Sequence, residues 1–327
     1  MSSKLPAMTR RSVVLAATLL ASAAALAQGG TYPSQPVRLV VPFPPAGGTD
    51  VVSRVVANEV TQATHWAFVL DNRPGAGGNI GLDIVAKAKN DGYTLGTGQT
   101  SNLAINPALY EKVPFDALKD FAPVALLATQ PLILVVKADS PIKTIADVKA
   151  RALKQPLTMA SAGNGTVGHL TGVMFANEAG FKLTHVPYKG AGPALTDLLG
   201  GQTDIYYGTP ASVLPMVRAG KLRAVAVTSA QRMPLLPGTP TIAESGYPKF
   251  VAEDWKAVVA PAGTPKDVIA QLNKAFNAAL TRPEAVTRMQ DEGSTPRPGT
   301  PEQLGAFMKT EYTRWGAAVK ASGAKAE

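Results

Sequence analysis

The stretch that decides the fold, Val40–Asp50, reads VVPFPPAGGTD and joins an apolar run to a helical pattern. The run Val37–Val41 leads into it, and valines at helical spacing follow it. A strand that turns through glycines into a helix leaves unpaired backbone N–H groups at the positive end of the helix dipole. Such a turn suits a carboxylate or a phosphate, although an ordinary capped turn has the same pattern. We expect Thr49 or Asp50 to be the helix N-cap.

The first 27 residues have the pattern of a secretion signal. Lys4, Arg10 and Arg11 precede an uncharged apolar run, 13–27, that ends in Ala25-Leu26-Ala27. This run is shorter than the ~20 residues that span a bilayer, and an A-x-A end is typical of signal-peptide cleavage. We expect cleavage after Ala27, by the general secretion route or by the twin-arginine route that Arg10-Arg11 also resembles. The sequence therefore predicts an exported, periplasmic protein.

The composition argues against several kinds of site. The chain has 327 residues and no cysteine, which excludes disulfides, thiolate nucleophiles and cysteine–zinc sites. Its three histidines are widely spaced, so no metal site is predicted. The formal net charge of +9 becomes +6 without the three basic residues of the signal. The basic residues are spread along the chain, whereas nucleic-acid binding needs a clustered basic face, so we expect no nucleic-acid partner.

Short apolar runs alternate with helical patterns, which predicts βαβ units and a largely parallel α/β sheet. The expected strands are Val37–Val41, Ala67–Leu70, Tyr93–Leu95, Leu132–Val136, Leu157–Ala160, Leu183–Val186, Ile205–Tyr207, Ala224–Val227 and Ala257–Ala260. Helices are expected to start near Asp50, Ile80, Ile145, Thr166, Pro193, Val213, Pro265 and Pro301. Thr264-Pro265 and Thr300-Pro301 each offer a threonine N-cap followed by proline at the first helical position.

No low-complexity linker separates two halves of the chain. We therefore expect the chain to pass between two lobes through strands, at 132–136 and again at 255–260. This predicts a first lobe from 31 to 130 plus 255 to 327, and a second lobe from 131 to 254, after the signal peptide at 1–27.

A second glycine-rich turn follows the expected strand Leu157–Ala160. Residues 161–169 read SAGNGTVGH, so small residues again run into a helix that a threonine opens. Two such turns, one in each lobe, would direct two helix N-termini into one cleft. A di- or tricarboxylate would then be held from both sides, whereas a monocarboxylate would use one end alone.

Other polar residues follow the ends of expected strands. The loop 71–81 reads DNRPGAGGNIG, and its Arg73 is expected to pair with Asp71 rather than with a ligand. We expect His185 to be structural, whereas His169 faces either the cleft or the interior. The remaining candidates at strand ends are Ser101, Asn102, Tyr188, Thr209 and Ser212.

No catalytic constellation is predicted. Gly163–Gly168 matches G-x-G-x-x-G, but the region 181–189 lacks the acidic residue that would hold a ribose. Ser161 does not lie in a G-x-S-x-G elbow because position 159 is methionine, and there is no P-loop. We therefore expect no enzyme, no catalytic residue, no metal and no cofactor.

Taken together, the chain resembles the Bug-type family, the extracytoplasmic receptors of tripartite tricarboxylate transporters, from Tyr32-Pro33 to Trp315. The resemblance rests on 42–50, 72–81, 91–95, 186–190, 193–201 and 260–265. It implies a type II periplasmic-binding fold, with two α/β lobes joined by a two-strand hinge and a ligand cleft between them. One departure is Val173 after Gly172, where the family often has glutamate; we expect that acid to support the lobe, so the binding role stands.

The resemblance also implies binding residues. The first turn would hold a ligand carboxylate largely through backbone groups and ordered waters, and the second lobe would read the rest of the ligand. The first role falls on Ala46, Gly47, Gly48, Thr49 and Asp50. The second falls on Ser161, Asn164, Gly165, Thr166, His169 and Thr209.

The function so implied is capture of a small carboxylated solute by lobe closure. The candidates are di- and tricarboxylates, acidic amino acids and aromatic acids, delivered by a monomer to integral-membrane transporter subunits. The alternative is a sensor subunit that presents the same ligand to a histidine kinase. An exported hydrolase would need a nucleophile and a base that the motifs do not supply. The family predicts the substrate poorly because its shared contacts hold the carboxylate that all candidates have.

Overall fold

The computed structural model describes residues 32–45, 48–188 and 190–326. The predicted signal peptide and the turn residues Ala46 and Gly47 lie outside the described residues. The chain separates into two units, Met1–Gln35 and Pro36–Glu327, and every described helix and strand lies in the second. No helix in the described part of the chain has the length and apolar character to cross a bilayer.

The first sheet has the strand order β11-β4-β10-β3-β1-β2. Its strands are β1 (Val37–Val41), β2 (Phe68–Asn72), β3 (Thr94–Gln99), β4 (Phe121–Pro131), β10 (Glu253–Pro261) and β11 (Thr295–Pro296). Its helices are α2 (Gly48–Thr64), α3 (Asn79–Ala86), α4 (Asn106–Leu109), α9 (Lys266–Leu280), α10 (Pro283–Asp291) and α11 (Pro301–Ser322). A 3-10 turn, Ala76–Gly78, and a π-helical turn, Thr100–Ile105, precede α3 and α4. We call these elements the first lobe.

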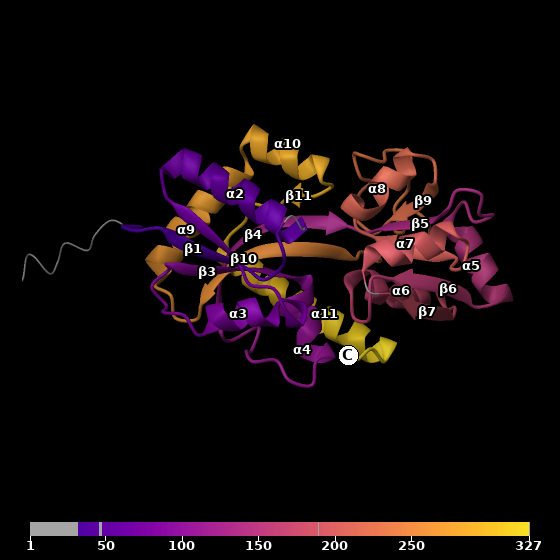
Figure 1. Ribbon diagram of the computed structural model, residues 1–327, viewed down its shortest axis with the longest axis horizontal. Coiled ribbons are helices and arrows are strands. Elements are labelled where there is room, and N and C mark those ends of the chain that lie inside the picture. Colours follow the sequence, from indigo (N-terminus) through magenta and orange to yellow (C-terminus); the bar gives the residue numbers. More distant parts are fainter. Residues whose placement is uncertain (1–31, 46–47, 189, 327) are drawn as a thin grey trace, which may run out of the picture. The chain divides into compact units, whose positions relative to one another are not determined.

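The second sheet has the strand order β7-β6-β8-β5-β9. Its strands are β5 (Ile133–Lys137), β6 (Leu157–Ser161), β7 (Leu183–Pro187), β8 (Ile205–Gly208) and β9 (Leu222–Val227). Its helices are α5 (Ile145–Lys154), α6 (Val167–Ala179), α7 (Ala191–Leu199) and α8 (Pro210–Arg218). These elements form the second lobe, so the expected two-lobed α/β architecture is confirmed (Figure 1).

Two passages of the chain connect the lobes. β4 ends at Pro131 and β5 begins at Ile133, so the first passage is at Leu132, and the second lies between β9 and β10. The fully buried Thr228 joins the two passages. Its hydroxyl accepts a hydrogen bond from Leu132 N at 2.8 Å and donates one to Ala252 O. The residue boundaries of the two lobes that were drawn from the sequence remain a prediction.

The expectation of largely parallel sheets is wrong, because both sheets are mixed. β1 runs parallel to β2 and β3, and β6 runs parallel to β7 and β8. β10 is antiparallel to both β3 and β4, and β5 is antiparallel to β8 and β9. Each of these antiparallel pairs includes β5 or β10, the strands that follow the two passages.

β4 was not among the expected strands. Pro123 lies inside this run, and proline argues against an interior strand because it cannot donate to the ladder. The ladder accommodates it at an irregularity, since the register between β4 and β10 shifts between Val258 and Val259, and Val259 is the partner of Pro123. Helix α10 and the short turns 100–109 were also missed.

Two of the predicted helix caps are confirmed and two are wrong. Thr166 caps α6 and Thr300 caps α11, and Thr300 N donates in return to Gln303 Oε1 at 2.9 Å. Helix α2 already begins at Gly48, so Thr49 and Asp50 lie within its first turn rather than at the N-cap. Helix α9 begins at Lys266 with Pro265 as the N-cap, and the Thr264 hydroxyl donates to Pro261 O instead.

Candidate functional site

Residues from both lobes line a pocket of about 360 Å³, which we call the interlobe pocket. Six of the candidate residues line it, namely Ser101, Asn164, Gly165, Thr166, Thr209 and Ser212. Its other polar lining residues were not expected at a site, namely Gln99, Asn106, Tyr110, Tyr206, Tyr207 and Asp254. The signal that was available for Gln99 is its place at the end of β3, two residues before the predicted Ser101.

The second-lobe side of the pocket is the turn that links β6 to α6. Gly165 has a φ of +68°, a left-handed conformation that glycine adopts without strain. Its backbone N donates to His169 Nδ1 at 3.1 Å, so a side chain of the following helix holds the turn. Thr166 Oγ1 donates to Gly163 O at 2.8 Å and accepts from His169 N at 3.4 Å. The turn is thus fixed by its own side chains, as a preformed binding loop requires.

His169 and His185 stack on each other behind this turn. Their ring centroids are 3.6 Å apart and the rings are inclined by only 6°. Burial lowers the pKa of His185 to about 4, and burial together with the charge of the neighbouring His185 lowers the pKa of His169 to about 3. Both rings are therefore neutral near pH 7. The expected structural role of His185 fits this arrangement.

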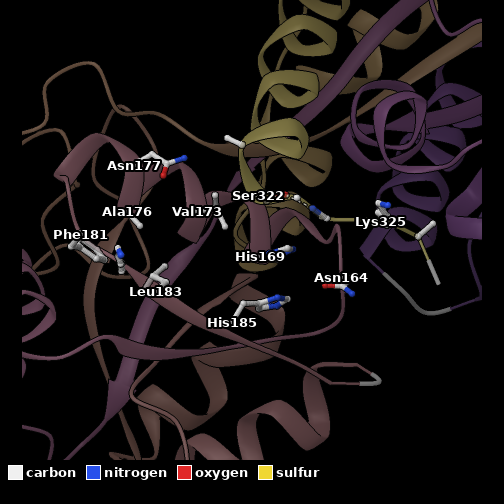
Figure 2. Close-up of a pocket in the computed structure, with 15 residues that line it drawn as sticks. Asn164, His169, Val173, Ala176, Asn177, Phe181, Leu183, His185, Ser322 and Lys325 are labelled. Carbon is white, nitrogen blue, oxygen red and sulfur yellow. Dashed lines mark hydrogen bonds between the residues drawn. The ribbon is translucent and has the colours of Figure 1, made fainter.

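Both histidines line a second cavity, of about 580 Å³, which also touches the C-terminal residues 321–326. Figure 2 shows the two rings side by side, with Asn164 near them and Lys325 beyond. His169 is 3% exposed and is not among the residues that line the interlobe pocket. The sequence left open whether His169 faces the cleft or the interior, and in the structure its ring does not line the interlobe pocket. A direct ligand contact by His169 stays a prediction.

The stacked histidines predict a pH dependence of stability. Because their pKa values are lowered in the folded state, the unfolded chain takes up protons first as the pH falls below about 6.5. The free energy of unfolding should therefore fall from about pH 6.5 towards pH 4, by up to about 1.4 kcal/mol per pH unit for each histidine. Urea titrations between pH 7.5 and 4.5 measure this slope.

The controls for this slope replace histidines by asparagine or glutamine, whose amide group takes the place of one ring nitrogen. The double variant His169→Asn, His185→Gln should have a flatter slope, whereas the exposed His65→Asn should leave the slope unchanged. Equal slopes in all three proteins would contradict the assignment.

In the first lobe, Asp50 lies in the first turn of α2 and is not among the residues that line the interlobe pocket. It is 1% exposed, and its carboxylate accepts hydrogen bonds from Arg54 Nε at 2.8 Å and from Asn72 Nδ2 at 2.9 Å. Asn72 Nδ2 also donates to Phe43 O at 3.0 Å, which fixes the residues that follow β1. Gly48 is exposed at the start of α2. A ligand contact by Gly48 or Asp50 would be made by the backbone of that residue, and it remains a prediction.

Thr49 reaches the pocket indirectly. Its hydroxyl is hydrogen-bonded to the side-chain oxygen of Gln99, and Gln99 Nε2 donates to Ser101 Oγ at 2.8 Å. Asn102 is fully buried, and its Oδ1 accepts from Gln99 N at 2.9 Å. Of the predicted pair in this turn, Ser101 therefore lines the pocket, whereas Asn102 supports the backbone behind it.

The remaining candidates have partners of their own. Tyr188 donates to Asp197 Oδ2 at 2.6 Å, and this hydrogen bond, with burial and the carboxylate charge, raises the pKa of the tyrosine. The predicted ion pair of Arg73 with Asp71 is confirmed, at 2.9 Å. Tyr188 is not one of the described residues that line the interlobe pocket.

Ser161 forms a pair that no motif indicated. Its Oγ lies 2.6 Å from His185 Nε2, on the neighbouring parallel strand, and 3.0 Å from Gly163 O. A serine beside a histidine can act as a nucleophile with its base. Here Ser161 is 1% exposed, and a histidine whose pKa is about 4 is a weak base near neutral pH. Within the described ranges, no three His, Asp or Glu side chains are placed to hold a metal ion.

Comparisons with known proteins agree with the fold. The family model described as tripartite tricarboxylate transporter family receptor matches residues 52–324. The structure of the R. palustris protein Rpa4515 with adipate is 35% identical, with a TM-score of 0.78 over 89% of this chain and 98% of that one. MatC from Rhodopseudomonas palustris with bound malate is 33% identical, with a TM-score of 0.73 over 88% and 100%. The periplasmic binding protein BugD is 34% identical, with a TM-score of 0.74 over 90% and 100%.

The two-lobed fold expected of a periplasmic solute-binding protein is therefore confirmed. With a match that spans most of its length, the chain belongs to the family of tripartite tricarboxylate transporter receptors, which includes the Bug proteins.

Proposed function

We propose that this protein captures a small carboxylated solute in the interlobe pocket by closure of its two lobes and delivers it to the membrane subunits of a tripartite tricarboxylate transporter. The observation that carries the proposal is the pocket itself. The β6–α6 turn and the start of α8 in one lobe, and the turn that follows β3 in the other, bring Ser101, Asn164, Gly165, Thr166 and Thr209 together around one cavity. Polar groups of this kind, held by their own hydrogen bonds, suit an anion better than an apolar ligand.

The relatives support the ligand class and the compartment. Solved relatives hold adipate and malate, which are both dicarboxylates, and another is a periplasmic binding protein. Together with the signal pattern at 1–27, this supports a protein that acts in the periplasm as a receptor and not as an enzyme. Co-purification with transporter subunits or with a histidine kinase would distinguish delivery from sensing.

The first turn is tested by a bulky side chain at Gly48. Nothing lies within 4 Å of a Cβ built at this exposed glycine, so Gly48→Leu should fold normally while it blocks the approach of a carboxylate to the turn. A carboxylate at about 100 times its dissociation constant should stabilise the wild-type protein by roughly 2.7 kcal/mol. We expect Gly48→Leu to lose this stabilisation for every carboxylate in a thermal-shift screen.

Gly238→Leu is the matched control because a Cβ at Gly238 also meets nothing within 4 Å. It should keep the full shift. Retention of the shift in Gly48→Leu would place the carboxylate elsewhere.

A further inference from the structure

Asp254 is the one charged side chain among the described residues that line the interlobe pocket. It lies near the start of β10, where the chain comes back from the second lobe, and Leu132 of the other passage lines the same pocket. Asp254 is 8% exposed. The pocket thus has a nearly buried carboxylate on the wall that the two connecting passages form.

One oxygen of this carboxylate is held within the protein. Asp254 Oδ2 accepts a hydrogen bond from Lys256 Nζ at 3.0 Å, and Lys256 is only 2% exposed. Lys256 also approaches Gln130 Oε1 at 3.4 Å, and Gln130 Nε2 donates to Glu292 O at 3.0 Å. This network on β4 and β10 fixes the orientation of the carboxylate.

The other oxygen, Asp254 Oδ1, is buried and has no hydrogen-bond partner within the described part of the chain. A buried acceptor that is left without a donor destabilises a protein, because it has lost its hydrogen bonds to water. A ligand that brings an N–H or O–H group to this oxygen would remove that penalty. A second carboxylate brought to the same place would instead meet a like charge.

We infer that Asp254 selects ligands that carry a protonated amine beside their carboxylate, so that the solute is an amino acid rather than a plain dicarboxylate. This rests on the proposed function, because the glycine turns must hold the carboxylate of the same molecule. The ammonium group of an amino acid donates a hydrogen bond to Oδ1, and its positive charge attracts the Asp254 carboxylate. A dicarboxylic acid without an amine or hydroxyl substituent leaves Oδ1 without a donor. Selection then comes from both attraction of the right ligand and repulsion of the wrong one.

The test uses matched sets of ligands and calorimetric titration of the chain without its signal. One set is L-aspartate, L-malate and succinate, and the other is L-glutamate, L-2-hydroxyglutarate and glutarate. Within a set that binds, we expect the amino acid to bind at least about tenfold more tightly than the unsubstituted acid, with the hydroxy acid between them. Asp254→Asn should remove most of this preference by weakening the amino acid, while the exposed Asp267→Asn should keep it.

The outcomes separate the inference from the proposed function. Unsubstituted acids that bind as tightly as amino acids would overturn the inference and leave carboxylate capture standing. A hydroxy acid that binds as tightly as the amino acid would overturn the inference that Asp254 selects a positively charged group. If no carboxylate binds in the interlobe pocket, both fail. If Asp254→Asn does not fold, the order of affinities in the wild-type protein decides the matter alone.

Discussion

Gly165→Ala should weaken binding of the solute by about tenfold or more, although it adds only one methyl group to the pocket. A Cβ built at Gly165 would lie 2.2 Å from Leu109 Cδ2 and 2.9 Å from Leu109 Cδ1. Gly165 belongs to the second lobe and Leu109 to α4 of the first, so the new methyl group holds the lobes apart where the pocket should close. The change is measured as the dissociation constant of the carboxylate found in the screen.

The control separates this contact from backbone strain. Gly180, at the end of α6, has a φ of +73° and nothing within 4 Å of a built Cβ. Both alanine variants therefore share the left-handed strain of roughly 1–2 kcal/mol, but only Gly165→Ala meets the other lobe. Gly180→Ala should lose stability and keep its affinity. Leu109→Ala should restore part of the affinity of Gly165→Ala, and equal affinities of the two glycine variants would contradict this account of closure.

Glu311→Ala should lower the free energy of unfolding by about 3 kcal/mol or more, the largest loss of stability that we expect from one substitution. Glu311 is 5% exposed, and its Oε2 accepts hydrogen bonds from three donors. These are Trp255 Nε1 at 3.1 Å, Trp315 Nε1 at 2.9 Å and Arg314 Nη2 at 2.9 Å. Both indoles are fully buried, so alanine leaves two N–H groups without an acceptor in the interior. Denaturant titration measures the loss.

Two further variants calibrate this result. Glu311→Gln keeps an acceptor for the indoles but loses the charge opposite Arg314, and should lose about half as much stability. Lys309→Ala removes an exposed side chain of the same helix and should change stability by less than about 0.5 kcal/mol. A loss below about 1 kcal/mol in Glu311→Ala would show that the indoles find other partners.

Local signals predicted the elements around the glycine turns well. β1 has the predicted bounds, Val37–Val41, and Thr166 and Thr300 cap the helices that they were expected to open. Each of these depends on residues that are close in sequence, where alternation, capping and turn chemistry act directly. The glycine turn between β6 and α6 was also a part of the pocket that the sequence indicated.

The rest depends on contacts between distant residues. β4 pairs with β10 across a gap of more than a hundred residues, and Pro123 obscured it. Ser161 meets His185 only because β6 and β7 are parallel neighbours in register, and no motif marks that pair. Nothing in the sequence around Asp254 marks it as a site residue, and only its position on β10 in the folded sheet places it at the pocket. Such groups become visible when the sheet order is known.

The most direct test of carboxylate capture is a calorimetric titration of the chain without its signal. The acid that stabilises the protein most in the screen is compared with the analogue in which each of its carboxylates is replaced by a primary amide. The amide has nearly the same size but no negative charge for the helix N-termini and backbone N–H groups to hold. We predict saturable binding of the acid and binding of the amide that is weaker by about a hundredfold or more. Equal affinities would contradict the account.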